Sequence, residues 1–363
     1  MEILLTFGTG LYLFFVILII IGLSNLTFHK HSKIDIPKVS VIIAARNEED
    51  NLPLLLGDLI QQTIPDEKLE IIIANDRSTD NTVSIVENLI LRYPFINLIN
   101  ILELSDHMRP KKYALTQAIK ASKGKIIVST DADCRVPKTW VLNMATSVKN
   151  SGAITVGFSK VACKNHFFHQ YQMIDFLGLM VINAGANGLG LNWGGSGQNL
   201  AYRKKDFNAI SGFEPVKNQT SGDDLYLVQK ISKINPAVFN IDPESFVSTL
   251  PVKSIGDFIS QRTRWSSNSK AFAIKTEMVV FLSLFIPFLF HFLILFAVFL
   301  QPSGMITIIL LKLIIDGLAI FLGGRLFQTM VSPIVFAFWF CMQPFYIPFI
   351  GIAGLIGKYS WKS

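Results

Sequence analysis

Two long uncharged segments, one towards each end of the chain, constrain its fold more than any other feature. Residues 3–23 form an apolar run of 21 residues, and residues 278–300 form another of 23. A helix of about 20 apolar residues is long enough to cross the hydrocarbon core of a membrane. The stretch between the two runs is polar. The sequence therefore predicts a membrane-integral protein whose middle part forms a separate domain.

Composition and charge agree with a membrane location. Half of the 363 residues are hydrophobic and only 16% are charged, which is too apolar for an ordinary soluble protein. The net charge of +7 suits an anionic membrane face or an anionic substrate. Nucleic acid is not an expected partner, because no dense Lys/Arg block or known binding motif is present. Cys134, Cys163 and Cys341 are too widely spaced for a zinc pattern or a disulfide framework, so a reducing cytosol is expected.

The N-terminal run is interpreted as a transmembrane helix within residues 1–28. A cleaved signal peptide is the alternative, but the basic residues at 29–33 follow the apolar run instead of preceding it. Basic residues after a span place that side in the cytoplasm. The predicted localisation is therefore the cell (inner) membrane, multi-pass, with the polar domain on the cytoplasmic face.

The C-terminal region, residues 278–363, is predicted to contain further membrane helices. A span over 305–322 is interrupted by Lys312 and Asp316, which are four residues apart and are interpreted as a structural pair facing protein. Residues 331–357 contain three prolines and form either one kinked span or a re-entrant hairpin. Lys358 and Lys362 favour a cytoplasmic tail, whereas counting spans puts the tail outside, so its side stays open.

The polar domain alternates apolar strand-like runs with helical stretches. Such alternation favours a mostly parallel α/β sheet, in which ligands bind beyond the carboxyl ends of the strands. Asp76 follows one predicted strand and Asp131 follows another. The predicted strands cover residues 39–45, 69–74 and 125–130, and the predicted helices run through Leu59, through Leu91 and over 112–121.

Carboxylates two residues apart at a strand end suit a hard divalent cation that carries a diphosphate. Asp131 and Asp133 follow an Ile-Ile-Val strand, and they are predicted to hold Mg²⁺ or Mn²⁺ together with diphosphate oxygens. The alternative is a solvated loop, because Asp-x-Asp is common by chance. Asp76 is predicted to contact a nucleotide base or ribose. Its alternative role is a helix cap, which Asp80 fills equally well.

The remaining candidates are a lysine pair, an aspartate pair and a later cluster. One of Lys111 and Lys112 is predicted to reach the diphosphate; a solvated helix start is the alternative. Of the pair Asp223-Asp224, Asp224 is predicted to be the general base. The other aspartate is interpreted as a carboxylate at a helix start, where the helix dipole stabilises it.

A third set follows the polar domain. Gln261, Arg264 and Trp265 lie at i, i+3 and i+4 and so share one helical face. They are predicted to bind phosphate and sugar; an interfacial Arg/Trp anchor is the alternative. The Gly- and Asn-rich run over 185–197 is expected to form a mobile acceptor loop. No P-loop and no Gly-x-Ser-x-Gly elbow is present.

At these positions the chain resembles the membrane-bound members of glycosyltransferase family 2, the processive and lipid-modifying inverting enzymes. The resemblance covers roughly residues 37–270, and its specificity lies in the order and spacing of its motifs. They are VSVIIAARNEEDN at 39–51, ANDRSTDNT at 74–82, KKYAL at 111–115, DAD at 131–133, GQNLAYR at 197–203, the Gly-Phe pair at 212–213, the Asp pair at 223–224 and QRTRW at 261–265.

The resemblance implies an α/β GT-A fold, of the nucleotide-diphospho-sugar transferase (Rossmann-like) type, over 34–253. An interfacial helix with the QRTRW motif follows over 254–277. It implies a nucleotide-sugar donor, usually a UDP-sugar, and one-step inversion at the anomeric carbon. The implied roles are base contact for Asp76, donor binding for Lys111, nucleotide and metal binding for Asp131 and Asp133, proton acceptance for Asp224, and closure over the donor for Gln261, Arg264 and Trp265.

Two departures from the family pattern affect these expectations. Asp223 stands where glutamate usually precedes the base, and residues 75–78 (Asn-Asp-Arg-Ser) stand where two aspartates and a glycine are common. At most four spans are visible, fewer than processive synthases tend to have. The expected acceptor is therefore a lipid or lipid-linked glycan, as for ceramide glucosyltransferase-like enzymes. A processive polysaccharide synthase and a non-catalytic membrane scaffold that retains the fold are the alternatives.

Overall fold

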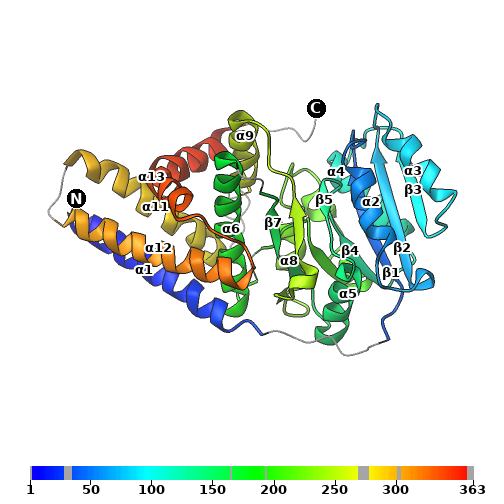
Figure 1. Ribbon diagram of the computed structural model, residues 1–363, viewed down its shortest axis with the longest axis horizontal. Helices are drawn as coiled ribbons and strands as arrows, with labels where there is room; N and C mark the ends of the chain where they lie inside the picture. Colours follow the sequence, from blue (N-terminus) through cyan, green and yellow to red (C-terminus); the bar gives the residue numbers. More distant parts are fainter. Residues whose placement is uncertain are drawn as a thin grey trace. The chain divides into compact units, whose positions relative to one another are not determined.

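The computed structural model describes residues 2–27, 35–163, 166–192, 194–268, 278–300 and 304–357. The chain groups into two compact units (Figure 1). The helical unit is drawn from Met1–Asn25, Val161–Leu189 and Pro251–Tyr359, and the sheet unit from Leu26–Lys160 and Gly190–Leu250. The basic stretch at 29–33 and the lysines Lys358 and Lys362, which bear on the predicted topology, lie outside the described residues.

The sheet unit is built on a seven-stranded sheet in the order β3-β2-β1-β4-β8-β6-β9. Only β8 runs antiparallel to the strands beside it, so the sheet is mostly parallel. A second sheet has the order β5-β10-β7. The strands are β1 (Val39–Ala45), β2 (Leu69–Asp76), β3 (Ile96–Ile101), β4 (Ile126–Ser129), β5 (Cys134–Arg135), β6 (Thr155–Gly157), β7 (Ser159–Val161), β8 (Leu200–Arg203), β9 (Val238–Asn240) and β10 (Val247–Thr249). This architecture confirms the predicted α/β fold.

Helices cover both faces of the sheet. Alternate residues of a strand point to opposite faces, and Val41 packs with Leu55 and Trp140 in one core cluster. Ile42, on the other face, lines a pocket with Leu115. The helices are α2 (Leu52–Ile60), α3 (Thr82–Ile90), α4 (Pro110–Ala121), α5 (Trp140–Ser151), α7 (Lys204–Ala209) and α8 (Asp223–Ile231), with short 3-10 helices η1 (Asp66–Lys68), η2 (Glu214–Val216) and η3 (Pro243–Ser245). The strands β1, β2 and β4 are mostly apolar because both of their faces are buried.

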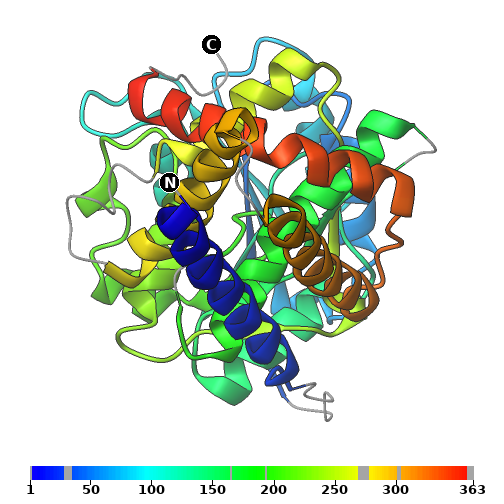
Figure 2. The ribbon, with the colours of Figure 1, turned by 90° about the vertical axis from the view of Figure 1, so that its left-hand side faces the viewer.

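The helical unit contains α1 (Glu2–Ser24), α6 (Phe167–Gly188), α9 (Ile255–Ser266), α11 (Met278–Leu300), α12 (Met305–Leu326) and α13 (Pro333–Ile356). In it, α1 packs against α6, α11 and α12, as Figure 2 shows for α1 in blue. Among the described residues, α1, α12 and α13 are long and apolar enough to cross a membrane, and α11 has a shorter apolar part over Leu284–Ala297. Residues 333–356 form one helix with Pro344 and Pro348 inside it, so a single helix and not a hairpin describes this segment.

The helix α6 is the main element that the sequence did not predict. Its residues fall within the predicted 34–253 domain, yet they pack against α1, α12 and α13 of the helical unit. Its C-terminal end also corrects the predicted loop over 185–197, because residues 185–188 are helical. A Cβ on Gly22 would lie 1.8 Å from the carbonyl oxygen of Gly185, and a Cβ on Gly188 would lie 1.9 Å from that of Gly22. These glycines therefore serve a close helix crossing.

The predicted pair in the span over 305–322 is confirmed. Lys312 Nζ lies 2.5 Å from Asp316 Oδ2, and both side chains are buried among the helices. Lys312 also donates to Gln343 Oε1, and Tyr12 donates to Asp316 Oδ1 at 2.7 Å. The charges therefore face protein and join α1, α12 and α13, which is how an ion pair is tolerated in an apolar bundle.

Candidate active site

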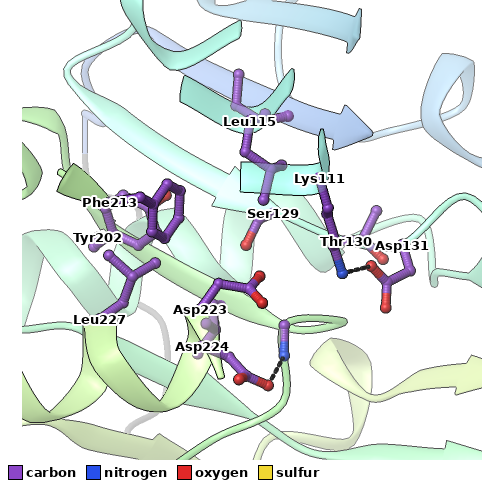
Figure 3. Close-up of a pocket in the computed structure, with 13 residues that line it drawn as sticks. Lys111, Leu115, Ser129, Thr130, Asp131, Tyr202, Phe213, Asp223, Asp224 and Leu227 are labelled. Carbon is purple, nitrogen blue, oxygen red and sulfur yellow. Dashed lines mark hydrogen bonds and ion pairs between the residues drawn. The ribbon is translucent and has the colours of Figure 1, made fainter. Parts of the chain in front are cut away.

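A pocket in the sheet unit opens where β4 ends and where α4 and α8 begin (Figure 3). Its charged side chains are Lys111, Asp131, Asp223 and Asp224, and the hydroxyl-bearing Ser129 and Thr130 also line it. Apolar side chains line the rest of the pocket, and Leu115, Tyr202, Phe213 and Leu227 are labelled in Figure 3. Because Asp131 follows the carboxyl end of β4, the pocket lies at the edge where parallel sheets bind ligands.

Lys111 and Asp131 form the cationic side of this pocket. Lys111 Nζ donates to Asp131 Oδ1 at 2.9 Å, and it comes from the first turn of α4. Burial alone would lower the pKa of Lys111, but the carboxylates of Asp131 and Asp223 raise it above its ordinary value. The ammonium is therefore charged at neutral pH and faces the cavity, where it can meet an anionic ligand.

Asp133 lies two residues beyond Asp131 and is half-buried. Its pKa is raised to about 6, first by burial and then by the negative charges of Asp131 and Glu48. Thr249 Oγ1 donates to Asp133 Oδ2 at 3.4 Å. The carboxylates of Asp131, Asp133 and Glu48 therefore lie close together, and their mutual repulsion opposes full ionisation.

These carboxylates suit a divalent cation that takes its remaining ligands from the substrate, and not one held by protein side chains alone. No group of three or more His, Cys, Asp or Glu side chains in the described part of the chain is arranged to hold a metal ion. A magnesium-like ion takes one or two carboxylates and completes its shell with substrate phosphates and water. Asp131 and Asp133 offer that kind of donor set, and a bound cation would relieve the repulsion that raises the pKa of Asp133.

Asp223 and Asp224 occupy the first turn of α8, after Gly222 in a left-handed conformation with φ 82°. Asp224 Oδ2 accepts from the main-chain N–H of Gly197 at 3.0 Å, and its Oδ1 accepts from Leu225 N–H at 2.8 Å. Burial, and then the neighbouring charge of Asp223, raise the pKa of Asp224 to about 6. A carboxylate so held is a better proton acceptor than an ordinary aspartate, which is what a general base requires.

Asp76 lies at the end of β2, among loops that follow the strands. It is 1% exposed, and Arg77 Nε donates to its Oδ1 at 2.8 Å. Arg46 Nη1 lies 3.9 Å from its other oxygen. Asp76 is not among the residues that line the pocket with Lys111. The side chain that binds the start of α3 is that of Asp80, which precedes the N-cap residue Asn81 and whose Oδ1 accepts from the N–H of Thr82 at 3.0 Å.

Gln261, Arg264 and Trp265 lie on α9, in the helical unit. Their neighbour Arg262, which the sequence analysis did not single out, is the centre of a buried cluster. Its guanidinium lies 4.3 Å from the Trp265 ring centroid, and its Nη1 donates to Gln261 Oε1 at 2.6 Å. Its Nε donates to Asp175 Oδ2 of α6 at 2.6 Å. The orientations of Gln261 and Trp265 therefore depend on Arg262.

Sequence reasoning missed the roles of Gly197 and Asp175, and it left open which of Lys111 and Lys112 reaches the pocket. Gly197 supplies a main-chain N–H, which leaves no side-chain signature. Lys112 turns away from the pocket and donates to the carbonyl oxygen of Gln219 at 2.7 Å. Asp175 stands in a mostly apolar stretch of α6, and an acidic residue in such a stretch is a sign of a buried polar contact. Of the lysine pair, Lys111 alone lines the pocket.

Comparison with known proteins places this arrangement in a family. The model of the family described as "Glycosyl transferase family 2" matches residues 40–211. Residues 40–211 therefore belong to glycosyltransferase family 2. The match spans β1 to α7, so it includes Asp76, Lys111, Asp131 and Asp133 but ends before Asp224.

Relatives within family 2 are distant. A probable glycosyltransferase, YdaM of Bacillus subtilis (strain 168), is 24% identical over 74% of this chain and 66% of its own length. A β-monoglucosyldiacylglycerol synthase of Nostoc sp. (strain PCC 7120 / SAG 25.82 / UTEX 2576) is 27% identical over 41% of this chain and 32% of its own length. The chain thus spans at most about two thirds of these relatives.

One solved structure shows the fold over almost the whole chain. It is the mannosyltransferase PcManGT from Pyrobaculum calidifontis in complex with GDP-Man and Mn²⁺. The TM-score is 0.61 at 18% identity, and the match covers 98% of this chain and 100% of that chain. At this identity the likeness concerns the fold alone, and it confirms the predicted GT-A architecture.

Proposed function

We propose that the chain is an inverting glycosyltransferase that moves a sugar from a nucleotide-sugar, of the UDP-sugar class, to a lipid or lipid-linked glycan. The observation that carries the proposal is the make-up of the pocket. It brings a carboxylate with a raised pKa, Asp224, to the same cavity as the Lys111–Asp131 pair. A proton acceptor and a diphosphate-binding cation are the two groups that one-step glycosyl transfer needs.

In the proposed reaction, Asp224 takes the proton of the acceptor hydroxyl while that oxygen forms a bond to the anomeric carbon. The bond from this carbon to the diphosphate oxygen breaks in the same step, and the nucleoside diphosphate leaves with the electron pair. Attack opposite the leaving group inverts the configuration. With a pKa of about 6, Asp224 is mostly ionised at pH 7 and is still more basic than an ordinary aspartate.

Positive charge on the side of the pocket opposite Asp224 is proposed to hold the diphosphate of the donor. The Lys111 ammonium is proposed to pair with the diphosphate, and Asp76 to contact the base or ribose. Mg²⁺ or Mn²⁺, held by Asp131 and Asp133 when bound, would neutralise the charge that develops on the leaving diphosphate. Gln261, Arg264 and Trp265 are proposed to close over the donor diphosphate and the acceptor.

A lipid acceptor is supported by the membrane helices and by one relative. Three helices of the described residues are long and apolar enough to cross a membrane, so the chain is associated with a membrane. The Nostoc relative is named as a synthase of a glucosylated diacylglycerol. We propose the cytoplasmic face for the sheet unit, on the ground of the basic residues at 29–33.

A processive synthase is the second candidate, because one further relative carries such a name. A poly-β-1,6-N-acetyl-D-glucosamine synthase of Staphylococcus aureus (strain MSSA476) is 28% identical over 39% of this chain and 33% of its own length. The length of the product separates the candidates, since a lipid transferase adds one sugar and a synthase makes a long polymer.

The test is a panel of radiolabelled donors on membranes that carry the protein. UDP-glucose, UDP-galactose, UDP-N-acetylglucosamine and GDP-mannose are supplied with lipid extract and Mn²⁺ or Mg²⁺, then with a chelator. Metal-dependent label in an organic extract is the expected result and names the sugar. Label in an insoluble or high-mass product would indicate the synthase instead, and no transfer from any donor would contradict both candidates.

A further inference from the structure

The second lysine at the start of α4 is more deeply buried than the first. Lys112 is 1% exposed. Its Nζ donates to main-chain carbonyl oxygens, that of Gln219 at 2.7 Å and that of Ser221 at 3.4 Å. Burial lowers the pKa of Lys112. An amine placed so deeply must keep its hydrogen bonds, because losing them leaves a polar group unsatisfied in the interior.

These carbonyl oxygens belong to the segment that leads into α8. The same turn of α4 also holds the segment further back, since Arg109 N–H donates to the carbonyl oxygen of Lys217 at 2.9 Å. Arg109 Nε donates to that of Asn218 at 3.3 Å. Arg109 and Lys112 therefore hold this segment at the carbonyl oxygens of residues 217, 218, 219 and 221. After them the chain passes through Gly222, at φ 82°, and reaches Asp223 and Asp224 directly.

Adjacent lysines of α4 thus serve different sides of the pocket. Successive residues of a helix point about 100° apart, so neighbours cannot share a target. Lys111 reaches Asp131 on the side proposed for the donor diphosphate. Lys112 reaches the segment that begins α8, which carries the proposed base Asp224. The first turn of α4 therefore contacts both the Lys111–Asp131 pair and the segment that carries Asp224, and the proposed transfer depends on the relative position of these groups.

We propose that Lys112 is a positioning residue that fixes Asp224 relative to the Lys111–Asp131 pair by clamping the carbonyl oxygens of Gln219 and Ser221. The proposal rests on the proposed function, because it assigns Lys112 to the geometry of that reaction. Lys112 touches no reacting atom. Without the clamp, the first turn of α8 can shift about Gly222, and a displacement of 1 Å at a reacting group costs about 100-fold in rate.

The test compares three methionine substitutions in the full-length protein in membranes. Lys112→Met keeps much of the side-chain length and removes the donor. Lys111→Met removes the neighbouring ammonium, and Lys120→Met changes an exposed lysine of the same helix. For Lys112→Met we expect kcat to fall about tenfold to 100-fold with donor KM within twofold of wild type. Lys111→Met should mainly raise donor KM, and Lys120→Met should change neither.

Two further measurements separate positioning from a merely structural role. Lys112→Arg retains a donor at this place and should recover part of the lost kcat, whereas a packing defect would not respond to the donor. Hydrogen exchange at the Gly197 amide, which bonds to Asp224, should be faster in Lys112→Met than in wild type. An unchanged kcat in folded Lys112→Met, or a parallel loss of kcat and donor affinity in Lys112→Met and Lys112→Arg, would overturn the proposal.

The exchange measurement also distinguishes this proposal from the proposed function. If wild-type protein transfers no sugar from any donor, the proposed function fails, but the clamp can still be measured. UDP and GDP binding and exchange at Gly197 and at residues 222–225 need no turnover. Unchanged exchange at these positions in Lys112→Met would show that Lys112 does not hold Asp224.

Discussion

The main-chain N–H of Gly197 donates a 3.0 Å hydrogen bond to Oδ2 of Asp224, which ties the segment that enters β8 to the first turn of α8. A second N–H, from Leu225, holds the other oxygen. Both bonds favour the ionised carboxylate, whereas burial and Asp223 favour the protonated one. The opposing effects leave the pKa of Asp224 at about 6, which is the range for a base that works near neutral pH.

This pKa predicts an acid limit to turnover. Because burial raises the pKa of Asp224 from its usual value near 3.8 to about 6, protonation removes the base below pH 6. We expect kcat at saturating donor to fall about tenfold for each pH unit below 6 and to be level above pH 7. Initial rates between pH 5 and 8 measure it. Asp66→Asn should give the same profile, and a rate that stays level down to pH 5 would exclude Asp224 as the base.

Metal-dependent nucleotide binding should also depend on pH. A proton on Asp133, whose burial and acidic neighbours raise its pKa to about 6, competes with a cation for the same oxygens. The affinity for UDP or GDP with Mn²⁺ is therefore expected to rise as pH increases through 6. Calorimetric titration at pH 5 and pH 7.5, with Mn²⁺ and then with chelator, measures it. Asp133→Asn should remove both the metal effect and the pH effect; a metal effect that survives this substitution would contradict the assigned role.

The buried ion pair between Arg262 and Asp175 is expected to matter for the stability of the helical unit. Asp175→Asn leaves a buried guanidinium without its partner, which typically costs about 3–5 kcal/mol. We expect a clear drop in apparent Tm in detergent for Asp175→Asn and for Arg262→Met, and a drop in the double variant that is smaller than the sum of the two, because no charge is then left buried. Lys253→Met, at an exposed position near α9, is the control. Additive losses in the double variant would show that the two side chains do not act together.

The crossing of α1 and α6 gives a matched pair of glycine substitutions. A Cβ on Gly22 would lie 1.8 Å from a backbone oxygen of Gly185, which cannot move aside as a side chain does, whereas a Cβ on Gly10 meets nothing within 4 Å. Gly22→Ala is therefore expected to destabilise the helical unit by about 1–3 kcal/mol or more. Gly10→Ala should be neutral or slightly stabilising, because alanine favours helix. Thermal unfolding of the two variants measures the difference; equal Tm values would argue against a close crossing.

The sequence predicted the elements whose signal is local. The runs at 39–45, 69–74 and 125–130 became β1, β2 and β4, because strands buried on both faces must be apolar throughout. The second strand continues to Asp76, since its pairing with β3 extends to Ile101 and draws the aspartate into the sheet. A long-range pairing of this kind leaves no mark in the sequence of either strand.

Features that depend on packing were not predicted. The helix α6 carries glycines at 185 and 188 that look like a loop signal, and only contact with α1 explains them. In the same way, Lys112 looks like a second solvated lysine, and Gly197 acts through its main chain. The carboxylates of the pocket were predicted because chemistry restricts their residue type, whereas the groups that position them can be of almost any type.

The most direct test of the central claim is transfer by Asp224→Asn beside wild type, with nucleotide binding measured on the same preparations. The substitution keeps the shape of the side chain and removes the proton acceptor. The account predicts that label transfer to the organic-extractable product is abolished, while affinity for the nucleotide with Mn²⁺ stays within a fewfold of wild type. Turnover by Asp224→Asn close to that of wild type would contradict it, because the pocket would then perform the transfer without its proposed base.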